Sequence, residues 1–233
     1  HAANREIVQS ALPEAVFVDA ADWGAVDEAL AASRAVAVGP ALGTGPEAAV
    51  LLARVLKADL PRVVDADALT LLSASPELRA AAVHAGAVVT PHPGEAARLL
   101  GRDVPESSSG RLEAVQALRE ATGAVVVLKG TPSLVLGSKG LLVDAVGSSD
   151  LAVAGMGDTL TGAIASFLGQ GVAPTAAAGL GLVVTGRAAA RAGMGPGLQA
   201  ADVPEHLPAA LAEGEGETDL RLPGVLLDLD PAR

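Results

Sequence analysis

The segment at residues 153–162, VAGMGDTLTG, contains the residue types and spacing in this chain that best suit ligand binding or catalysis. Its glycines precede an expected helix over residues 158–169, with Asp158 at the first helical position. Glycines let a backbone approach a ligand closely, and the free N–H groups at a helix start bind anions such as phosphate. The helix dipole keeps a carboxylate at that position ionised. Asp158 could therefore accept a proton from a hydroxyl that is being phosphorylated. The alternative interpretation is that Asp158 is an ordinary N-cap beside a tight turn.

Glycines and carboxylates also follow two expected strands, and ligands of parallel α/β sheets lie outside such carboxyl ends. The strand 35–38 runs into GPALGTG at 39–45, which has neither the lysine of a P-loop nor the spacing of a dinucleotide fold. The strand 62–65 ends in Asp65 and Asp67. This pair could hold hydrated Mg²⁺ or orient a hydroxyl, or Asp67 could simply cap the helix that runs to residue 73.

His92 and Lys129 follow two further expected strands, 87–90 and 125–128. Prolines on both sides make the backbone of His92 stiff, which suits a side chain presented to a ligand; a surface histidine is the alternative. Glu95, three residues on, fits a first-turn acid favoured by the helix dipole. Lys129 is followed by glycine and suits a phosphate or adenine-ribose contact, or else it is an exposed hairpin lysine.

The elements that must position these residues alternate short β-branched runs with longer Ala/Leu-rich stretches, the pattern of a mostly parallel sheet covered by helices. Expected strands are 15–18, 35–38, 62–65, 87–90, 125–128, 133–136 and 141–143. The last three are joined by connections too short for crossover helices and should form antiparallel hairpins at one end of the sheet. Expected helices cover 23–33, 76–85, 94–100, 110–121, 158–169, 174–192 and 202–212, and a capping box at 44–47 opens another that runs to 57.

Composition narrows the class of protein. The chain has 233 residues, no cysteine, a net charge of −11 and a pI near 4.7. The length suits one large α/β domain, and the absence of cysteine excludes disulfides and thiolate chemistry. The acidic balance, with one Trp, two Phe and no Tyr, argues against nucleic-acid binding. The most apolar stretch, 176–184, is interrupted by glycines and too short to cross a bilayer, and the polar start gives no sign of a signal peptide. We expect a soluble cytoplasmic protein.

The two ends of the chain raise separate expectations. The Glu- and Gly-rich residues 213–218 should form a mobile loop, and the apolar residues 220–229 should dock on the domain or on a second subunit. The chain begins without Met, with one polar helical segment before a strand, which suggests that a preceding βα unit is absent from the chain as given.

Taken together and in this order, the segments resemble the ADP/ATP-dependent NAD(P)H-hydrate dehydratases, within the ribokinase-like superfamily. The resemblance runs from about residue 35 to 171 and rests on GPALGTG (39–45), VVDADAL (63–69), VVTPHPGEAARLLG (88–101), VVVLKGTPSLV (125–135) and LAVAGMGDTLTGAIASFLGQG (151–171). The segment with His92 discriminates best, because small-molecule kinases of this superfamily usually have Asn at that position. The resemblance implies a three-layer α/β/α sandwich that forms a single domain over 1–233.

The resemblance also implies a reaction and roles for residues. NAD(P)H hydrate would be dehydrated at the expense of ADP or ATP with Mg²⁺, in nicotinamide nucleotide repair. Asp158 would be the acid–base residue and contact the hydrate, together with Gly43 and His92. Gly157 would hold nucleotide phosphate. The AMP portion of the nucleotide would be lined by Lys129, Gly130, Thr131, Pro132 and Ser133. The family further implies a homo-oligomer, a tetramer, with an N-terminal epimerase domain in the natural protein.

The chain departs from the family pattern in two loops. GSSD at 147–150 stands where the family has GNPG, and Leu-Ala-Val at 151–153 stands where it has Met-Ala-Thr. The lost asparagine and threonine put some polar nucleotide contacts in doubt. Ala41 replaces the middle glycine of GPGLG. Two other functions compete with the dehydratase. A kinase of the same fold would phosphorylate a vitamin-like alcohol such as hydroxymethylpyrimidine or hydroxyethylthiazole with the same Asp158. A nucleotide-binding module without catalysis is the third reading.

Overall fold

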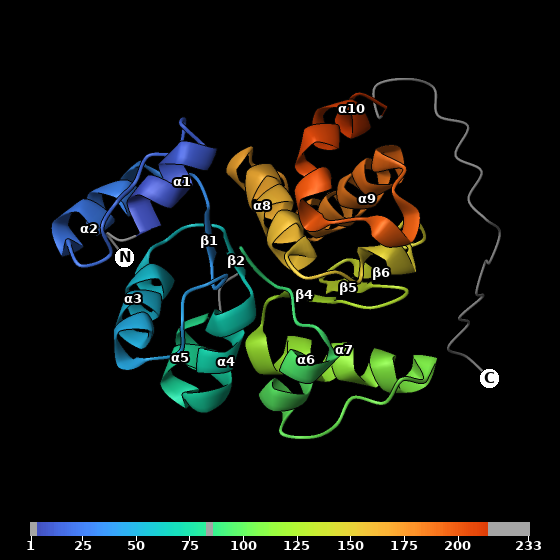
Figure 1. Ribbon diagram of the computed structural model, residues 1–233. Coiled ribbons are helices and arrows are strands. Elements are labelled where there is room, and N and C mark those ends of the chain that lie inside the picture. Colours follow the sequence, from blue (N-terminus) through green and yellow to red (C-terminus); the bar gives the residue numbers. More distant parts are fainter. Residues whose placement is uncertain (1–3, 83–85, 214–233) are drawn as a thin grey trace.

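The computed structural model describes residues 4–82 and 86–213, and its centre is a six-stranded sheet in the order β1-β2-β3-β4-β5-β6 (Figure 1). The strands are β1 (Val36–Val38), β2 (Arg62–Val64), β3 (Ala87–Val89), β4 (Val125–Leu128), β5 (Leu134–Gly137) and β6 (Gly140–Val143). β1 to β4 are parallel, whereas β4, β5 and β6 pair antiparallel. The expected mixed sheet with hairpin strands at one end is therefore confirmed.

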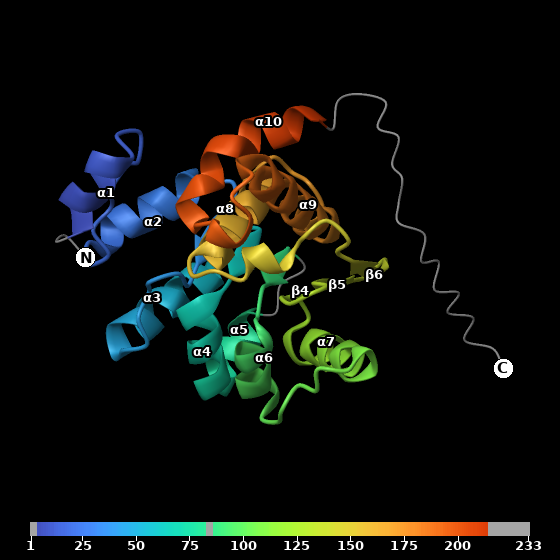
Figure 2. The same cartoon turned by 45° about the vertical axis from the view of Figure 1, so that its right-hand side comes forward.

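Helices cover the two faces of the sheet in separate sets (Figures 1 and 2). One face carries α3 (Pro46–Lys57), α4 (Ala66–Ala74), α5 (Pro76–Ala82), α6 (Pro93–Leu100) and α7 (Ser108–Thr122). The other carries α8 (Met156–Gly169) and α9 (Pro174–Ala192), with α10 (Leu207–Ala212) packed on α9. This is the three-layer α/β/α arrangement that the resemblance implied.

Alternating side chains of the strands fill the core on both faces. On β2, Val63 packs with Leu160 and Ile164 of α8, whereas Val64 faces the cluster formed with Leu52 of α3. Successive residues of a strand point to opposite faces, so a strand buried on both sides is apolar throughout. β2, β3 and β4 are buried along their whole lengths, which explains their nearly uninterrupted apolar sequences.

Arg62 is a charged residue within this core, with 1% of its surface exposed. Its guanidinium donates to the carbonyls of Leu60 (3.1 Å), Leu56 (2.6 Å) and Ala58, at and just beyond the end of α3. The last carbonyls of a helix lack partners within the helix, and the guanidinium supplies them. Burial lowers the pKa of Arg62 below the ordinary arginine value.

Several expected boundaries were wrong. Residues 15–18 form no strand: Val16 is 90% exposed, and β1 pairs with β2 alone among the described strands. Thr44 forms no capping box, because Gly45 is the N-cap of α3 and makes no side-chain hydrogen bond. The expected helix 202–212 is divided into short 3₁₀ turns at Ala200–Asp202 and Pro204–His206, followed by α10.

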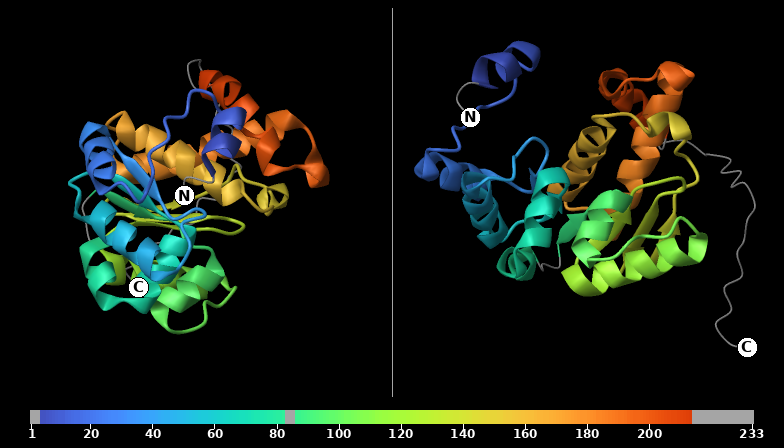
Figure 3. Two further views of the ribbon diagram at one scale, coloured as in Figure 1. Left: turned by 60° about the vertical axis from the view of Figure 1, so that its left-hand side comes forward. Right: turned by 60° about the horizontal axis from the view of Figure 1, so that its bottom comes forward.

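The N-terminal helices α1 (Arg5–Ala11) and α2 (Trp23–Ala32) lie at the β1 end of the sheet, away from β6 (Figure 3). α1 is the polar helical segment that the sequence predicted, and it contains no buried residue. The end of the expected helix 76–85 and the predictions for 214–218 and 220–229 lie outside the described residues. Within the described part of the chain, no helix combines the length and apolarity needed to span a membrane.

Candidate active site

The start of α8 lies at the carboxyl end of the sheet, but its boundary differs from the prediction. The helix begins at Met156, so Asp158 is its third residue rather than its first. Gly155 is the N-cap with φ of +85°, a left-handed conformation that a glycine adopts without strain. The side chain of Asp158 is exposed and forms no hydrogen bond or ion pair with the described residues. The amides of Met156 and Asp158 donate to the carbonyls of Val153 (3.3 Å) and Gly155 (3.1 Å), whereas the Gly157 amide has no hydrogen-bond partner among the described residues. One free amide and an available carboxylate thus lie together at this helix start.

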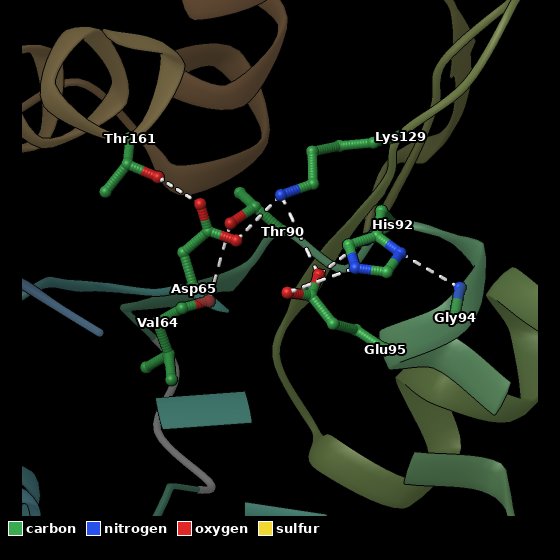
Figure 4. A network of polar contacts seen from close by, with 8 residues as sticks. All are labelled: Val64, Asp65, Thr90, His92, Gly94, Glu95, Lys129 and Thr161. Atoms are coloured by element: carbon green, nitrogen blue, oxygen red, sulfur yellow. Dashed lines mark hydrogen bonds and ion pairs between the residues drawn. The ribbon is translucent and has the colours of Figure 1, made fainter. Parts of the chain in front are cut away.

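Asp65 is the centre of a polar network that joins three of the predicted segments (Figure 4). Its carboxylate is 1% exposed and accepts hydrogen bonds from Lys129 Nζ and from Thr161 Oγ1, both at 2.8 Å. Lys129 Nζ also lies 3.8 Å from Glu95. Asp65 thereby links the end of β2 to the end of β4 and to the second turn of α8. Sequence analysis placed Asp65 at a strand end but gave no sign of Thr161 as its partner.

Gly157 brings the backbone of α8 against this network. A Cβ atom built on Gly157 would lie 3.3 Å from Lys129 Nζ and 3.5 Å from Asp65 Oδ2. The ammonium group of Lys129 is therefore next to the first turn of α8, where the free amide of Gly157 and the positive end of the helix dipole favour an anion such as phosphate. The reading of Lys129 as an exposed hairpin lysine is wrong, because its side chain is only 21% exposed and is paired with Asp65.

His92 is the N-cap of α6 and forms a capping box with Glu95. Its Nδ1 accepts a hydrogen bond from the Gly94 amide at 3.0 Å, and its own amide donates to Glu95 Oε2 at 2.8 Å. Its Nε2 lies 3.5 Å from Glu95 Oε1, and half of the side chain is exposed. The imidazole is thus held in place by α6 and presented at the same edge of the sheet as Lys129 (Figure 4).

The loop at 39–45 is fixed by Asp67, whose Oδ2 accepts the amide of Gly43 at 2.8 Å. Asp67 is therefore not the cap of α4, which was the simpler of its two readings. Ala41 and Ala66 have φ of +53° and +51°, which is uncommon for residues with a Cβ. Ala41 occupies the position where the family pattern has glycine, so the loop keeps a glycine-like backbone without the glycine. Ala41 lies in the loop at 39–45 and Ala66 is the first residue of α4, so both strained residues follow strand ends next to the site.

Arg111 of α7 fixes the turn that follows β4 by a hydrogen bond to its backbone. Its guanidinium donates to the Pro132 carbonyl at 2.7 Å, and a Cβ on Gly130 would lie 2.4 Å from Arg111 Nη1. Gly130 has φ of +150°, and the Thr131–Pro132 peptide bond is cis. Ser133 closes the turn by donating to the Gly130 carbonyl at 3.0 Å. Sequence analysis missed Arg111, because it lies 21 residues before its partner.

A cavity of about 350 Å³ lies between the start of α6, the turn after β4, and helices α8 and α9. Six of the predicted site residues line it: His92, Lys129, Gly130, Thr131, Ser133 and Gly157. Gly43, Pro132 and Asp158 are not among its lining residues, although the backbone of Asp158 directly follows Gly157. Further lining residues come from the loop at 144–153, from Met156 and Leu160 of α8 and from Leu182 and Thr185 of α9. No group of three His, Asp or Glu side chains that could hold a metal ion exists among the described residues.

A mostly parallel sheet with antiparallel strands at one edge, covered by helices on both faces and with a glycine-containing helix start beside a lysine at its carboxyl end, is the architecture of the ribokinase-like class. Solved structures share this architecture. An ADP/ATP-dependent NAD(P)H-hydrate dehydratase from Bacillus subtilis, co-crystallized with ATP/Mg²⁺ and soaked with CoA, is 27% identical with a TM-score of 0.73, over 91% of this chain and 78% of that one. A hydroxyethylthiazole kinase from Pyrococcus horikoshii shares the fold at 17% identity and a TM-score of 0.63, over 79% and 75% of the two chains.

Sequence comparison identifies the family of the chain, which the shared fold alone does not. The family model described as NAD(P)H-hydrate dehydratase matches residues 2–210, and the chain belongs to this family. It is 45% identical over 139 residues to an ADP-dependent (S)-NAD(P)H-hydrate dehydratase of Neisseria meningitidis, covering 58% of this chain and 47% of that protein. It is 40% identical over 167 residues to the bifunctional NAD(P)H-hydrate repair enzyme Nnr of Escherichia coli, covering 71% of this chain and 31% of Nnr. The chain thus spans about a third of such bifunctional relatives.

Proposed function

We propose that this protein converts the hydrate of NADH or NADPH back to the reduced nicotinamide nucleotide, with ADP or ATP as the phosphoryl donor. The family membership supports this activity. The observation that carries it is the position of Gly157, where the phosphate-attracting start of α8 meets Lys129 at the edge of the cavity. The half-exposed imidazole of His92 lies on the same cavity, where the family pattern distinguishes a dehydratase from a kinase.

In this proposal the nucleotide occupies the cavity. Gly157 and the first turn of α8 bind its phosphates, and the turn that runs from Lys129 to Ser133 lines its AMP portion. Four residues of this turn, Lys129, Gly130, Thr131 and Ser133, line the cavity. Mg²⁺ would accompany the nucleotide and be held mainly by phosphate oxygens and water. The metal would neutralise charge on the transferring phosphoryl group.

The hydrated ring lies between the loop at 39–45, near Gly43, and His92. The hydrate carries a hydroxyl on C6, and hydroxide is a poor leaving group. Its oxygen forms a bond to the terminal phosphorus of the nucleotide as the bridging P–O bond breaks, and Asp158 accepts the hydroxyl proton. The lone pair of the ring nitrogen then expels phosphate, and loss of a proton from C5 restores the double bond. The exposed, unpaired carboxylate of Asp158 suits this role.

The test is to incubate the protein with NADH hydrate and either ADP or ATP while following the absorbance band of the reduced nicotinamide. Recovery of the band with one nucleotide and not without it supports the proposal and identifies the donor. Asp158→Asn should abolish turnover while ADP still binds, because the helix amides remain. A stable phosphorylated product from an alcohol screen, without dehydration, would instead assign a kinase. ADP binding without any turnover would assign a non-catalytic module.

The wider context of the activity is also part of the proposal. The Escherichia coli relative is named as bifunctional, which supports the proposal of an N-terminal epimerase domain in the natural protein. We propose that the enzyme acts as a cytoplasmic homo-oligomer, and ultracentrifugation tests its assembly state.

A further inference from the structure

Arg111 holds part of the cavity wall without lining the cavity itself. It lies in α7, and its Nη2 donates to the Pro132 carbonyl at 2.7 Å. Four residues of the turn at 129–133 line the cavity, whereas Arg111 is not among the lining residues. Arg111 would therefore influence a ligand in the cavity through the shape of this turn and not by contact.

Gly130 fits closely against the guanidinium of Arg111. A Cβ built on Gly130 would lie 2.4 Å from Nη1, 2.7 Å from Nη2 and 2.9 Å from Cζ of Arg111. The guanidinium thus occupies the space that a side chain at residue 130 would fill, and any such side chain would displace it. One planar group therefore sets the positions of two backbone segments of the turn, at Gly130 and at Pro132.

The rest of the turn has few fixed points. The Lys129 amide donates to the Pro91 carbonyl at 2.9 Å, and the Ser133 hydroxyl donates to the Gly130 carbonyl at 3.0 Å. Residues 130–132 between them are exposed, and within the described part of the chain the Pro132 carbonyl accepts from Arg111 alone. An exposed segment that contains glycine has many accessible conformations. Without its donor, the turn would keep its present shape for less of the time.

A second arginine of α7 shows that this role depends on position. Arg119 donates to the Ala124 carbonyl at 3.0 Å, a bond of the same kind, but it joins the end of the helix to the residue before β4. Neither Arg119 nor its acceptor lines the cavity. Among the described residues, Arg111 has no carboxylate at ion-pair distance, so its guanidinium serves the turn and no salt bridge.

We propose that Arg111 is a positioning residue for the adenine nucleotide: it holds the turn at 129–133 in the shape that accepts the AMP portion. The inference rests on the proposed function, which places the AMP portion on this turn. The phosphate contacts are fixed separately, because Lys129 pairs with Asp65 at 2.8 Å and Gly157 belongs to α8. Loss of Arg111 would lower the fraction of molecules with a binding-competent turn, and the apparent Kd rises by the inverse of that fraction.

The test compares a ligand that has the AMP portion with one that lacks it. Arg111→Ala should raise the Kd for ADP, measured by titration calorimetry, by about 5- to 20-fold, the range for loss of a charged hydrogen-bond donor. Inorganic tripolyphosphate lacks the AMP portion, and salt at about 0.15 M screens distant charges, so its Kd should change by less than about twofold. With NADH hydrate, the KM for the nucleotide should rise as the Kd does, whereas kcat should stay at the wild-type value.

Two further variants complete the test. Arg111→Lys keeps a donor for the Pro132 carbonyl but loses the planar contact with Gly130, so its Kd for ADP should lie between those of the wild type and Arg111→Ala. Arg119→Ala is the matched control, because it loses the same kind of bond on the same helix away from the cavity. It should bind ADP as the wild type does.

The inference is overturned if either folded Arg111 variant binds ADP as the wild type does, or if ADP and tripolyphosphate are weakened equally. It is also overturned if kcat falls while the KM for the nucleotide stays unchanged, or if Arg119→Ala weakens ADP binding as much as Arg111→Ala does. If wild-type protein binds no ADP, the proposed function fails together with the inference. If the wild type binds ADP and turns over the hydrate while the Arg111 variants match it, only the inference fails.

Discussion

Replacing Asp65 with asparagine removes one negative charge from the centre of the polar network and leaves its shape nearly unchanged. Asp65 is 1% exposed and receives hydrogen bonds of 2.8 Å from Lys129 and from Thr161. Asparagine can keep the bond with Thr161, because its amide both donates and accepts. It cannot neutralise the ammonium group of Lys129. The variant therefore isolates the contribution of the ion pair between Asp65 and Lys129.

The expected loss of stability follows from the burial of the two partners. Removing one member of a fully buried ion pair costs about 3–5 kcal/mol. Lys129 is 21% exposed and has Glu95 at 3.8 Å as a second acidic neighbour, so its charge is partly compensated. We therefore expect Asp65→Asn to lower the free energy of unfolding by about 2–3 kcal/mol, less than the fully buried case. For a protein of this size each kcal/mol shifts Tm by about 2–4 °C, which gives a fall of roughly 4–12 °C.

Urea denaturation followed by circular dichroism, together with a thermal scan, measures this loss. Asp67→Asn is the matched control: Asp67 accepts one backbone amide, that of Gly43, and it faces no ion-pair partner among the described residues. It should lose less stability than Asp65→Asn. The reasoning is refuted if Asp65→Asn has the wild-type free energy of unfolding, since Lys129 would then need no buried carboxylate.

Three further changes test other parts of the account. Gly157→Ala should weaken ADP binding at least tenfold without loss of stability, because the added Cβ would lie 3.3 Å from Lys129 Nζ, where phosphate is expected. Gly162→Ala is the control on the same helix: a Cβ at Gly162 would meet no atom within 4 Å, so this variant should bind ADP as the wild type does. Arg62→Met should lower the free energy of unfolding by about 2–4 kcal/mol in urea titrations, because several carbonyls around the end of α3 lose their donor; wild-type stability would contradict this. The hydrogen bond from Arg54 lowers the pKa of Asp27. This exposed pair therefore stabilises the fold at pH values above the ordinary aspartate pKa, and the stabilisation is lost as pH falls through the lowered pKa. Asp27→Asn should change Tm only slightly and remove this part of the pH dependence of Tm, and a pH profile of Tm identical to that of the wild type would contradict the prediction.

The sheet and most of its helices were predictable because their signals are local. Uninterrupted apolar runs marked β2, β3 and β4, and these strands are buried along their lengths. The run at 15–18 gave the same signal and was wrong, since a strand also needs a neighbour and this segment has none within the described sheet. A short apolar run in the sequence does not indicate whether a neighbouring strand is present to pair with it.

The candidate site was predictable in its segments but not in its contacts. Parallel strands place their carboxyl ends at one edge, so the ends of β2 and β4 had to be near each other. Which side chains meet there depends on pairs 64 and 96 residues apart, Asp65 with Lys129 and with Thr161, and on the absence of a Cβ at Gly157.

The proposed chemistry requires that phosphate leave in the same reaction that restores the nicotinamide. The most direct measurement therefore follows inorganic phosphate and the reduced-nicotinamide absorbance together, in one reaction with NADH hydrate and the preferred nucleotide. The account predicts equal molar amounts of phosphate and NADH, both abolished in Asp158→Asn. NADH recovered without phosphate, or nucleotide consumed with a phosphorylated product that accumulates, would contradict it.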